Sequence, residues 1–303
     1  MVSIVVLTFN RFSLLSQTIS SILDQTYTDF EIIIVNDGST DETGSLHSFF
    51  TDARIKLFNL EKQNNLAKLR NFGIQHSKGE YIAFCDDDDL WIKRKLEIQM
   101  PLLMEYEFVC SNAKLIDISN NVVSEQYINF MSSSVLDTKT LLLNNVIMPS
   151  SVVFNRKILK DNNSPFDEHK YTNLCEDYNL WIKMSVFAKM YFLNKELILH
   201  RTHESWARSF KNSQEIYSNH ISLMLPFTGS NDSEIRKTAF LSILNNKIYR
   251  IRNLYEHKKY FSSVKYSAAL FLSLLRPVNF KTFYLRSESY LRNKRQSDLD
   301  RSQ

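Results

Sequence analysis

The sequence predicts an α/β protein with a mostly parallel sheet flanked by helices, extended at its C-terminal end by a helical region. Through residue 85, short apolar runs alternate with segments in which apolar side chains recur at helical spacing. Parallel strands need crossover connections, so strands that alternate with helices of roughly 10–15 residues indicate βαβ units. From about residue 212 onward the apolar pattern is mainly helical.

The first predicted strand covers residues 3–9, an apolar and β-branched run typical of a buried strand. The apolar positions Phe12, Leu15, Ile19 and Ile22 follow at spacings that predict one face of a helix. The alternation then continues with predicted strands over 31–35, 54–59 and 80–85 and predicted helices over about 41–52 and 65–77.

Composition narrows the class of protein. The 303 residues are 44% hydrophobic and 23% charged, which excludes a disordered or collagen-like chain. Three cysteines without CxxC spacing argue against a disulfide framework or a zinc knuckle and favour a reducing compartment. We find no signal peptide and no apolar run of roughly 20 residues. We therefore expect a cytoplasmic protein, soluble or peripheral on a membrane.

The charge is unevenly distributed along the chain. Residues 246–303 hold 13 basic and 4 acidic side chains, a net of +9, whereas residues 1–245 carry a net of −5. The small overall excess of +4 gives little reason to expect a nucleic-acid partner. An apolar segment at 261–275 beside basic residues would suit an anionic membrane surface on the cytoplasmic side. The alternatives are a solvated helical end, packing on the preceding domain, or a homodimer contact.

Polar clusters follow three of the predicted strands, at residues 8–10, 37–39 and 86–89. In open α/β sheets, ligands bind outside the carboxyl ends of the strands, so we expect these clusters to meet at one edge. The sequence has neither GxGxxG nor GxxxxGK[ST], which disfavours a dinucleotide site and a P-loop.

Four consecutive aspartates, Asp86–Asp89, form the most distinctive cluster. Neighbouring carboxylates raise one another's pKa values or bind a cation, and oxygen ligands suit Mg²⁺ or Mn²⁺. The alternative is that Asp88 or Asp89 caps a helix beginning at Leu90, which would explain only one or two of the four.

Four further acidic or histidine positions are less distinctive. Asp37 could belong to a plain turn, although its place after a strand favours a site. Glu176 and Asp177 precede a periodic apolar run and could be only the acidic first turn of a helix. His203 on its own carries little weight.

Taken together, these segments resemble glycosyltransferase family 2, the inverting, nucleotide-sugar-dependent enzymes of the GT-A fold. The resemblance covers about residues 1–210 and depends on seven motifs in the family's order. They are VVLTFNR (5–11), EIIIVNDGSTDET (31–43), LAKLRNFGI (66–74), YIAFCDDDDLW (81–91), FDE (166–168), EDYNLW (176–181) and RTHESWARS (201–209).

The resemblance implies a GT-A catalytic domain over residues 1–210, with a donor half to about 110 and an acceptor half from about 111. The remaining residues, 211–303, form a helical and basic C-terminal region. The family's donor-nucleotide site maps onto Thr8, Asn10, Arg11, Asp37, Arg70, Asp86 and Asp87. The pattern departs from the family at Asn64 and Asn65, where relatives commonly have glycines.

The resemblance also implies catalytic roles. Asp177 matches the family's base, with Glu176 beside it, and Asp88 matches the ligand of a divalent cation, Mn²⁺ or Mg²⁺. His203 matches a histidine that approaches the metal or diphosphate, and Arg208 an arginine at the leaving group.

These roles predict single-displacement transfer of a sugar from a nucleotide-sugar, a UDP-sugar, to a hydroxyl of a glycan or glycolipid. Assembly of a surface polysaccharide, O-antigen or glycolipid is the expected context. One alternative is a non-catalytic glycan-binding or scaffolding protein with a transferase-like fold. The other is a sugar nucleotidyltransferase, a class with a glycine-rich loop where residues 8–11 read TFNR.

Overall fold

The computed structural model describes residues 1–160, 162–169, 175–202 and 210–256, together with Ser267. Its strands are β1 (Val2–Thr8), β2 (Phe30–Asn36), β3 (Ile55–Asn59), β4 (Tyr81–Asp86), β5 (Leu90–Trp91), β6 (Phe108–Ile116), β7 (Val122–Ser124), β8 (Ser134–Leu136), β9 (Val153–Asn155) and β10 (Met190–Arg201). Its α-helices are α1 (Phe12–Leu23), α2 (Leu66–Gln75), α3 (Lys95–Gln99), α4 (Thr138–Leu143), α5 (Glu176–Ser185), α6 (Phe210–Met224) and α7 (Ser233–Glu256). Short 3-10 helices are η1 (Glu42–Ser48), η2 (Met100–Met104), η3 (Pro149–Ser151), η4 (Arg156–Leu159) and η7 (Leu225–Gly229).

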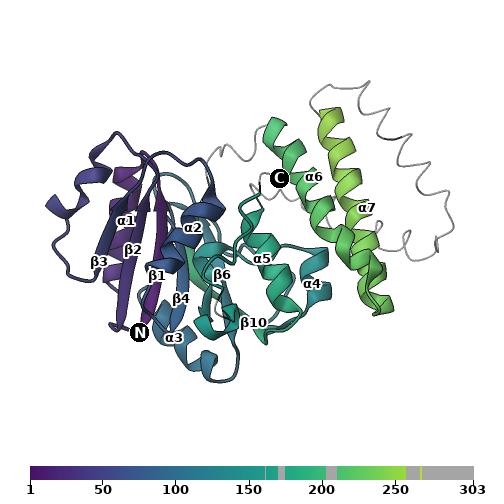
Figure 1. The fold of residues 1–303 in the computed structure, drawn as a ribbon, viewed down its shortest axis with the longest axis horizontal. Coiled ribbons are helices and arrows are strands. Elements are labelled where there is room, and N and C mark those ends of the chain that lie inside the picture. The colour runs from purple at the N-terminus through teal and green to yellow at the C-terminus, as the bar shows by residue number, and fades with distance from the viewer. Residues whose placement is uncertain (161, 170–174, 203–209, 257–266, 268–303) are drawn as a thin grey trace.

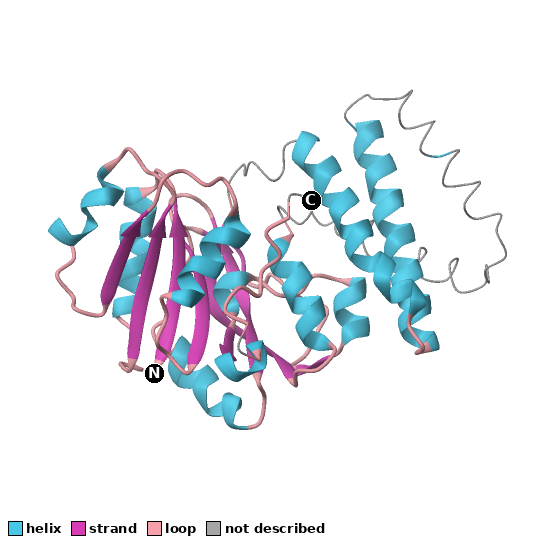
Figure 2. Ribbon diagram, viewed as in Figure 1, coloured by secondary structure: helices cyan, strands magenta, loops and turns pink. Residues whose placement is uncertain are grey.

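The strands form one mixed sheet in the order β3-β2-β1-β4-β9-β6-β10-β5, with β7 beside β6 and β8 beside β10. The first four strands in this order are parallel. β9 runs antiparallel to both of its neighbours, and β6 and β10 are parallel to each other. Figure 2 shows this twisted sheet with helices packed along it. The predicted mixed, mostly parallel sheet is therefore confirmed.

A hydrophobic core lies on each face of the sheet, which is why β1 has apolar side chains on both faces. Alternate side chains of β1 (Val2, Ile4 and Val6) pack with the α1 face, while Val5 belongs to the core on the other side. That second core is continuous with α2 and α5. Gly73 lets α2 approach β1 closely, because a Cβ at this position would lie 2.4 Å from a methyl carbon of Val5.

Two predictions about local structure were wrong. The segment predicted as a helix over 41–52 forms only η1, whose backbone leaves helical geometry at Ser45. The helix predicted to begin at Leu90 begins at Lys95, because Leu90 and Trp91 pair with β10 as β5. Asp88 and Asp89 therefore do not cap a helix.

The mainly helical character predicted beyond residue 212 is confirmed for the described residues. Figure 1 shows α6 and α7 side by side at the end of the molecule opposite β3. Met224, Ala239 and Ile243 from these helices share a core with Leu141 and Leu142 of α4. The segment 261–275, apart from Ser267, lies outside the described residues. None of the described helices combines the length and the apolar character that crossing a membrane requires.

Candidate active site

The three polar clusters meet at the carboxyl edge of the parallel strands, as expected. Thr8 at the end of β1 is in register with Asn36 of β2, and Leu7 is in register with Asp86 of β4. The backbone N–H of Asp37 donates to the carbonyl of Thr8 at 2.9 Å. Parallel pairing thus brings residues about 80 positions apart in the chain to one edge.

Asp37 organises the loop that follows β3. Its carboxylate accepts hydrogen bonds from the backbone N–H groups of Gln63 at 2.6 Å and Asn64 at 3.2 Å, and it lies 2.9 Å from the Lys62 ammonium. Asn64 has a φ of 53°, a left-handed conformation that glycine adopts readily and asparagine tolerates. Asn65 caps α2 by accepting from the N–H of Lys68. The two asparagines therefore provide the turn and the cap that join this loop to α2.

Asn10 fixes the loop after β1, as Asp37 and Asn64 fix the loop after β3. It also has a positive φ, 51°, and its side-chain oxygen accepts from the N–H of Thr40 at 2.7 Å. Its own N–H donates to the hydroxyl of Ser39 at 2.8 Å. A hollow of about 630 Å³ opens beside Asn10 and Arg11. Its size falls in the range of roughly 300–1,000 Å³ found for small-molecule sites.

The four aspartates divide into three environments. Arg11 donates to both Asp87, at 3.0 Å, and Asp88, at 2.8 Å. Asp89 is buried and accepts hydrogen bonds from the hydroxyl of Ser150 and the N–H of Arg201. Asp86 belongs to neither group, and its side chain is 40% exposed. The run thus has one carboxylate facing the site, two paired with Arg11, and one built into the core.

The electrostatics of the run follow from these contacts. Burial by the surrounding protein raises the pKa of Asp86 to about 7, although its carboxyl group reaches solvent. The positive charge of Arg70 opposes this rise, whereas the negative charges of Asp89 and Asp88 add to it. Burial likewise raises the pKa of Asp87 to about 6 against the opposing charge of Arg11. Cation binding at this edge would favour the ionised carboxylates and so oppose the rise in pKa that burial and the neighbouring carboxylates cause.

Arg70 links the donor edge to the start of α5. Its buried guanidinium donates to the carboxylate of Glu176 and lies 3.7 Å from Asp86. Asp177, the next residue, is half-buried and accepts from the N–H of Tyr178 at 2.7 Å. Burial and the charge of Glu176 raise the pKa of Asp177 to about 6, while Arg70 opposes the shift. A carboxylate with a raised pKa beside an open edge has the properties of a general base.

Three residues that hold the aspartates in place were not predicted. His200 Nδ1 lies 3.0 Å from Asp89, and Arg201 donates through Nε to the carbonyl of Asp88 at 2.9 Å. Ser150, buried in η3, also accepts from the N–H of Asp86. The polar pair of His200 and Arg201 at the end of an apolar strand was the available sequence signal. His203 and Arg208, which were predicted instead, lie outside the described residues.

Comparison with known proteins identifies the family. Residues 3–162, more than half of the chain, match the family model described as Glycosyl transferase family 2. The chain belongs to glycosyltransferase family 2. The expectation that it is a glycosyltransferase with a GT-A fold is therefore confirmed.

Its relatives include an enzyme of Escherichia coli, the UDP-Glc:alpha-D-GlcNAc-diphosphoundecaprenol beta-1,3-glucosyltransferase WfgD. The two are 34% identical over 186 residues, which are 61% of this chain and 69% of WfgD. Other relatives are longer: the 198 residues that match an uncharacterized glycosyltransferase of Rickettsia bellii at 33% identity are 65% of this chain and 28% of that protein.

Solved structures share the fold at low sequence identity. S. aureus TarS in complex with UDP-GlcNAc superposes with a TM-score of 0.65 over 84% of this chain and 72% of that chain, at 17% identity. The mannosyltransferase PcManGT from Pyrobaculum calidifontis, in complex with GDP-Man and Mn²⁺, gives a TM-score of 0.58 over 96% and 79% of the two chains, at 14% identity.

Proposed function

We propose that this family 2 glycosyltransferase transfers a sugar from a UDP-sugar to a hydroxyl of a glycan or lipid-linked glycan, with inversion at the anomeric carbon. The observation that carries the proposal is the chain of contacts from Asp86 through Arg70 to Glu176, which fixes a carboxylate of raised pKa, Asp177, beside the donor edge. The donor and the lipid-linked acceptor in the name of WfgD support the choice of substrates.

We assign the donor nucleotide to the edge formed by the loops after β1 and β2. Asn10 and Asp37 give these loops their shape, and Thr8 lies between them at the end of β1. Arg11, Arg70 and Asp87 complete the donor side. Two positive side chains at this edge suit the negative diphosphate of a nucleotide-sugar.

The carboxylates at this edge fit a divalent cation. Within the described part of the chain, no group of three or more His, Cys, Asp or Glu side chains could hold a metal ion. One or two carboxylates together with substrate phosphates are, however, the usual way in which proteins hold Mg²⁺. We assign this role to Asp88, next to Asp86, with His203 as a further predicted contact of the metal or diphosphate. Arg208 is predicted at the leaving diphosphate rather than at the cation. When bound, the cation would stabilise the negative charge that develops on the departing diphosphate.

We assign proton removal to Asp177. In a single displacement, the acceptor oxygen bonds to the anomeric carbon while the bond from that carbon to the diphosphate oxygen breaks. The hydroxyl proton passes to the Asp177 carboxylate, and no enzyme nucleophile is needed. Glu176 is held by Arg70 and has the role of positioning its neighbour. Base assistance of this kind typically contributes about 10²- to 10⁴-fold to the rate.

The acceptor class supports a position at the cytoplasmic face of a membrane. A lipid-linked acceptor would lie at the membrane, and the net charge of +9 over residues 246–303 would favour anionic headgroups. Liposome flotation tests this part: flotation with anionic but not with neutral vesicles is expected, and no flotation with either contradicts it.

The experiment for the main proposal has two parts. Calorimetry with UDP and Mn²⁺ measures donor-site binding directly, and nucleotide release from a panel of UDP-, GDP- and dTDP-sugars with Mn²⁺, Mg²⁺ or EDTA measures turnover. We expect UDP binding and EDTA-sensitive release from one UDP-sugar. An Asp177→Asn variant should bind UDP normally and release little nucleotide. Absence of UDP binding by the wild type would overturn the proposal in favour of a non-catalytic role.

A further inference from the structure

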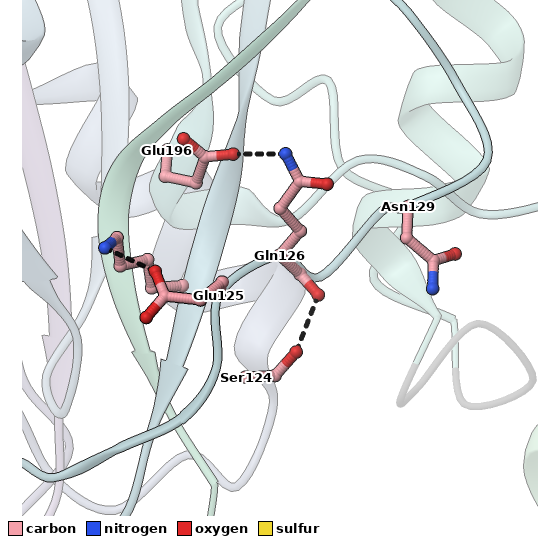
Figure 3. Close-up of a pocket in the computed structure, with 6 residues that line it drawn as sticks. Ser124, Glu125, Gln126, Asn129 and Glu196 are labelled. Carbon is pink, nitrogen blue, oxygen red and sulfur yellow. Dashed lines mark hydrogen bonds and ion pairs between the residues drawn. The ribbon is translucent and has the colours of Figure 1, made fainter. Parts of the chain in front are cut away.

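A second hollow lies in the acceptor half, away from the donor edge. Its volume is about 390 Å³. It lies where β7 and the segment after it run beside β6, which in turn pairs with β10. Figure 3 shows its lining, which consists of Lys114, Ser124, Glu125, Gln126, Asn129 and Glu196. No role in the proposed reaction has been assigned to these residues, and the volume suits a small ligand or one part of a larger one.

The chemistry of this hollow suits a neutral, polyhydroxylated ligand. Lys114 neutralises Glu125 in an ion pair at 2.6 Å, and the neutral amide of Gln126 donates to the Glu196 carboxylate at 2.7 Å. Asn129 also lines the hollow and is not bonded to any other residue drawn in Figure 3. Amide, carboxylate and hydroxyl groups together offer both donors and acceptors, which is what sugar hydroxyls require. Two carboxylates against one ammonium disfavour a phosphate or a nucleotide.

The hollow lies along β10 from the residues that support the aspartate run. Glu196 precedes His200 by four residues, a distance of at most about 13 Å along a strand. Tyr127, which follows Gln126, has its ring centroid 6.3 Å from that of His200. His200 in turn lies 3.0 Å from Asp89. The hollow therefore lies within the length of a short saccharide from residues that support the aspartate run, so a sugar bound there would belong to a longer acceptor chain.

We propose that this hollow binds a sugar residue of the acceptor that does not itself react. This inference rests on the proposed function and deepens it, because it makes the preferred acceptor a saccharide of at least two residues. Glu196, Gln126 and Asn129 supply the polar contacts. Tyr127, whose side chain is 41% exposed, supplies an aromatic face beside the path.

The test measures saccharide binding to the full chain in the presence of UDP and Mn²⁺. The probes are N-acetylglucosamine, its β-1,4-linked disaccharide, maltose and lactose, titrated by saturation-transfer NMR. We expect a disaccharide to bind more tightly than the monosaccharide, and Glu196→Ala and Asn129→Ala each to weaken the disaccharide about tenfold. Glu105→Ala is the matched control. Glu105 is an exposed glutamate that pairs with Lys189, the residue directly before β10, and it does not line the hollow.

The outcomes separate this inference from the proposed function. Equal disaccharide affinity in the wild type and both variants would overturn the inference, as would binding of UDP without binding of any probe. Failure to bind UDP would instead count against the proposed function. Two variants are used because one of them could fail to fold. Loss of UDP affinity in Glu196→Ala would show that it does not fold, and Asn129→Ala would then decide the question.

Discussion

Arg70 and Glu176 form a buried ion pair that joins the middle of α2 to the first residue of α5. Both side chains are almost fully buried, with exposed fractions of 6% and 4%. Glu176 also has a second carboxylate oxygen with no hydrogen-bond partner among the described residues. The Arg70 guanidinium is therefore the main stabilising partner of the buried Glu176 carboxylate, which lies next to the proposed base, Asp177.

Replacing Arg70 with Met should strongly destabilise the protein. The change leaves the Glu176 carboxylate buried without its partner, and breaking a buried pair in this way typically costs about 3–5 kcal/mol. Urea unfolding followed by circular dichroism measures the loss directly.

The double variant R70M/E176M is the informative control. Removing both charges should restore much of the free energy of unfolding, because apolar replacements of a buried pair are often nearly neutral. Arg94→Met, which breaks an exposed pair with Glu97, should leave stability unchanged. If R70M and R94M had equal effects, the pair would not have the structural role assigned here.

Asp177→Asn should lower activity and raise stability together. Loss of the base is expected to reduce kcat by about 10²- to 10⁴-fold. Because burial and Glu176 raise the pKa of Asp177 to about 6 in the folded protein, its ionised form is disfavoured there. Asparagine removes that cost, which we expect to be roughly 1–2 kcal/mol at neutral pH. Steady-state kinetics and thermal unfolding on the same preparation check both effects.

The size of this stability gain depends on pH. Below about pH 4 Asp177 is protonated in both the folded and the unfolded chain, so the variant gains nothing. The gain grows between about pH 4 and pH 6 and is complete above the folded pKa. A stability difference that was equal at pH 4 and pH 7.5 would contradict the raised pKa.

The wild-type enzyme should lose activity in acid through the same residue. With a base of pKa about 6, kcat/KM should fall tenfold per pH unit below that value and level off above it. Saturating Mn²⁺ is needed in this measurement, because Asp86, whose pKa is raised to about 7, also takes up a proton in the range where the cation binds. A flat profile down to pH 5 would move the base elsewhere.

Adjacent aspartates should respond differently to the same change. Asp88→Asn is expected to raise the Mn²⁺ concentration needed for half-maximal activity, with little effect on unfolding. Asp89→Asn should instead destabilise the protein by about 1.5–3 kcal/mol, because Asp89 accepts hydrogen bonds from Ser150, His200 and Arg201. Metal titrations and urea unfolding of both variants make the comparison, and interchanged results would reverse the two roles.

The sequence was sufficient to predict the parallel strands and the edge where their polar ends meet. Buried parallel strands such as β1 and β2 each contain a continuous apolar run, over residues 4–7 and 32–35, so their position is visible in the pattern. The position of Asp37 and Asp86 follows from such runs. Periodicity did not predict β5, because two residues are too few to show a pattern and their pairing with β10 is a long-range contact.

The division of the aspartate run could not be predicted from the sequence. Which carboxylate faces the site depends on Arg11, Ser150 and His200, which come from three distant parts of the chain. Each of these contacts is set by tertiary packing, and nothing in the local sequence distinguishes Asp86 from Asp89. The same reason explains why Arg70 and Glu176 were both predicted as site residues while the ion pair between them was not.

Replacing Lys95 should raise the free energy of unfolding without changing the residues assigned to the reaction. Its side chain is fully buried, and its ammonium lies 4.0 Å from the ring centroid of Trp91 with no hydrogen-bond partner among the described residues. Burial lowers the pKa of Lys95 to about 7. Lys95→Met keeps the aliphatic volume and should stabilise the protein by roughly 1–3 kcal/mol at pH 6.

The pH dependence of this gain distinguishes the buried charge from simple packing. Below about pH 7 the folded protein carries the full cost of a buried ammonium, and above that value the lysine gives up its proton on folding. The advantage of Lys95→Met should therefore be largest at pH 6 and shrink steadily towards pH 10. Lys93→Met, at a position 62% exposed, is the control and should show no such trend. A gain that was constant across this range would mean that it comes from better packing of the methionine rather than from removal of a buried charge.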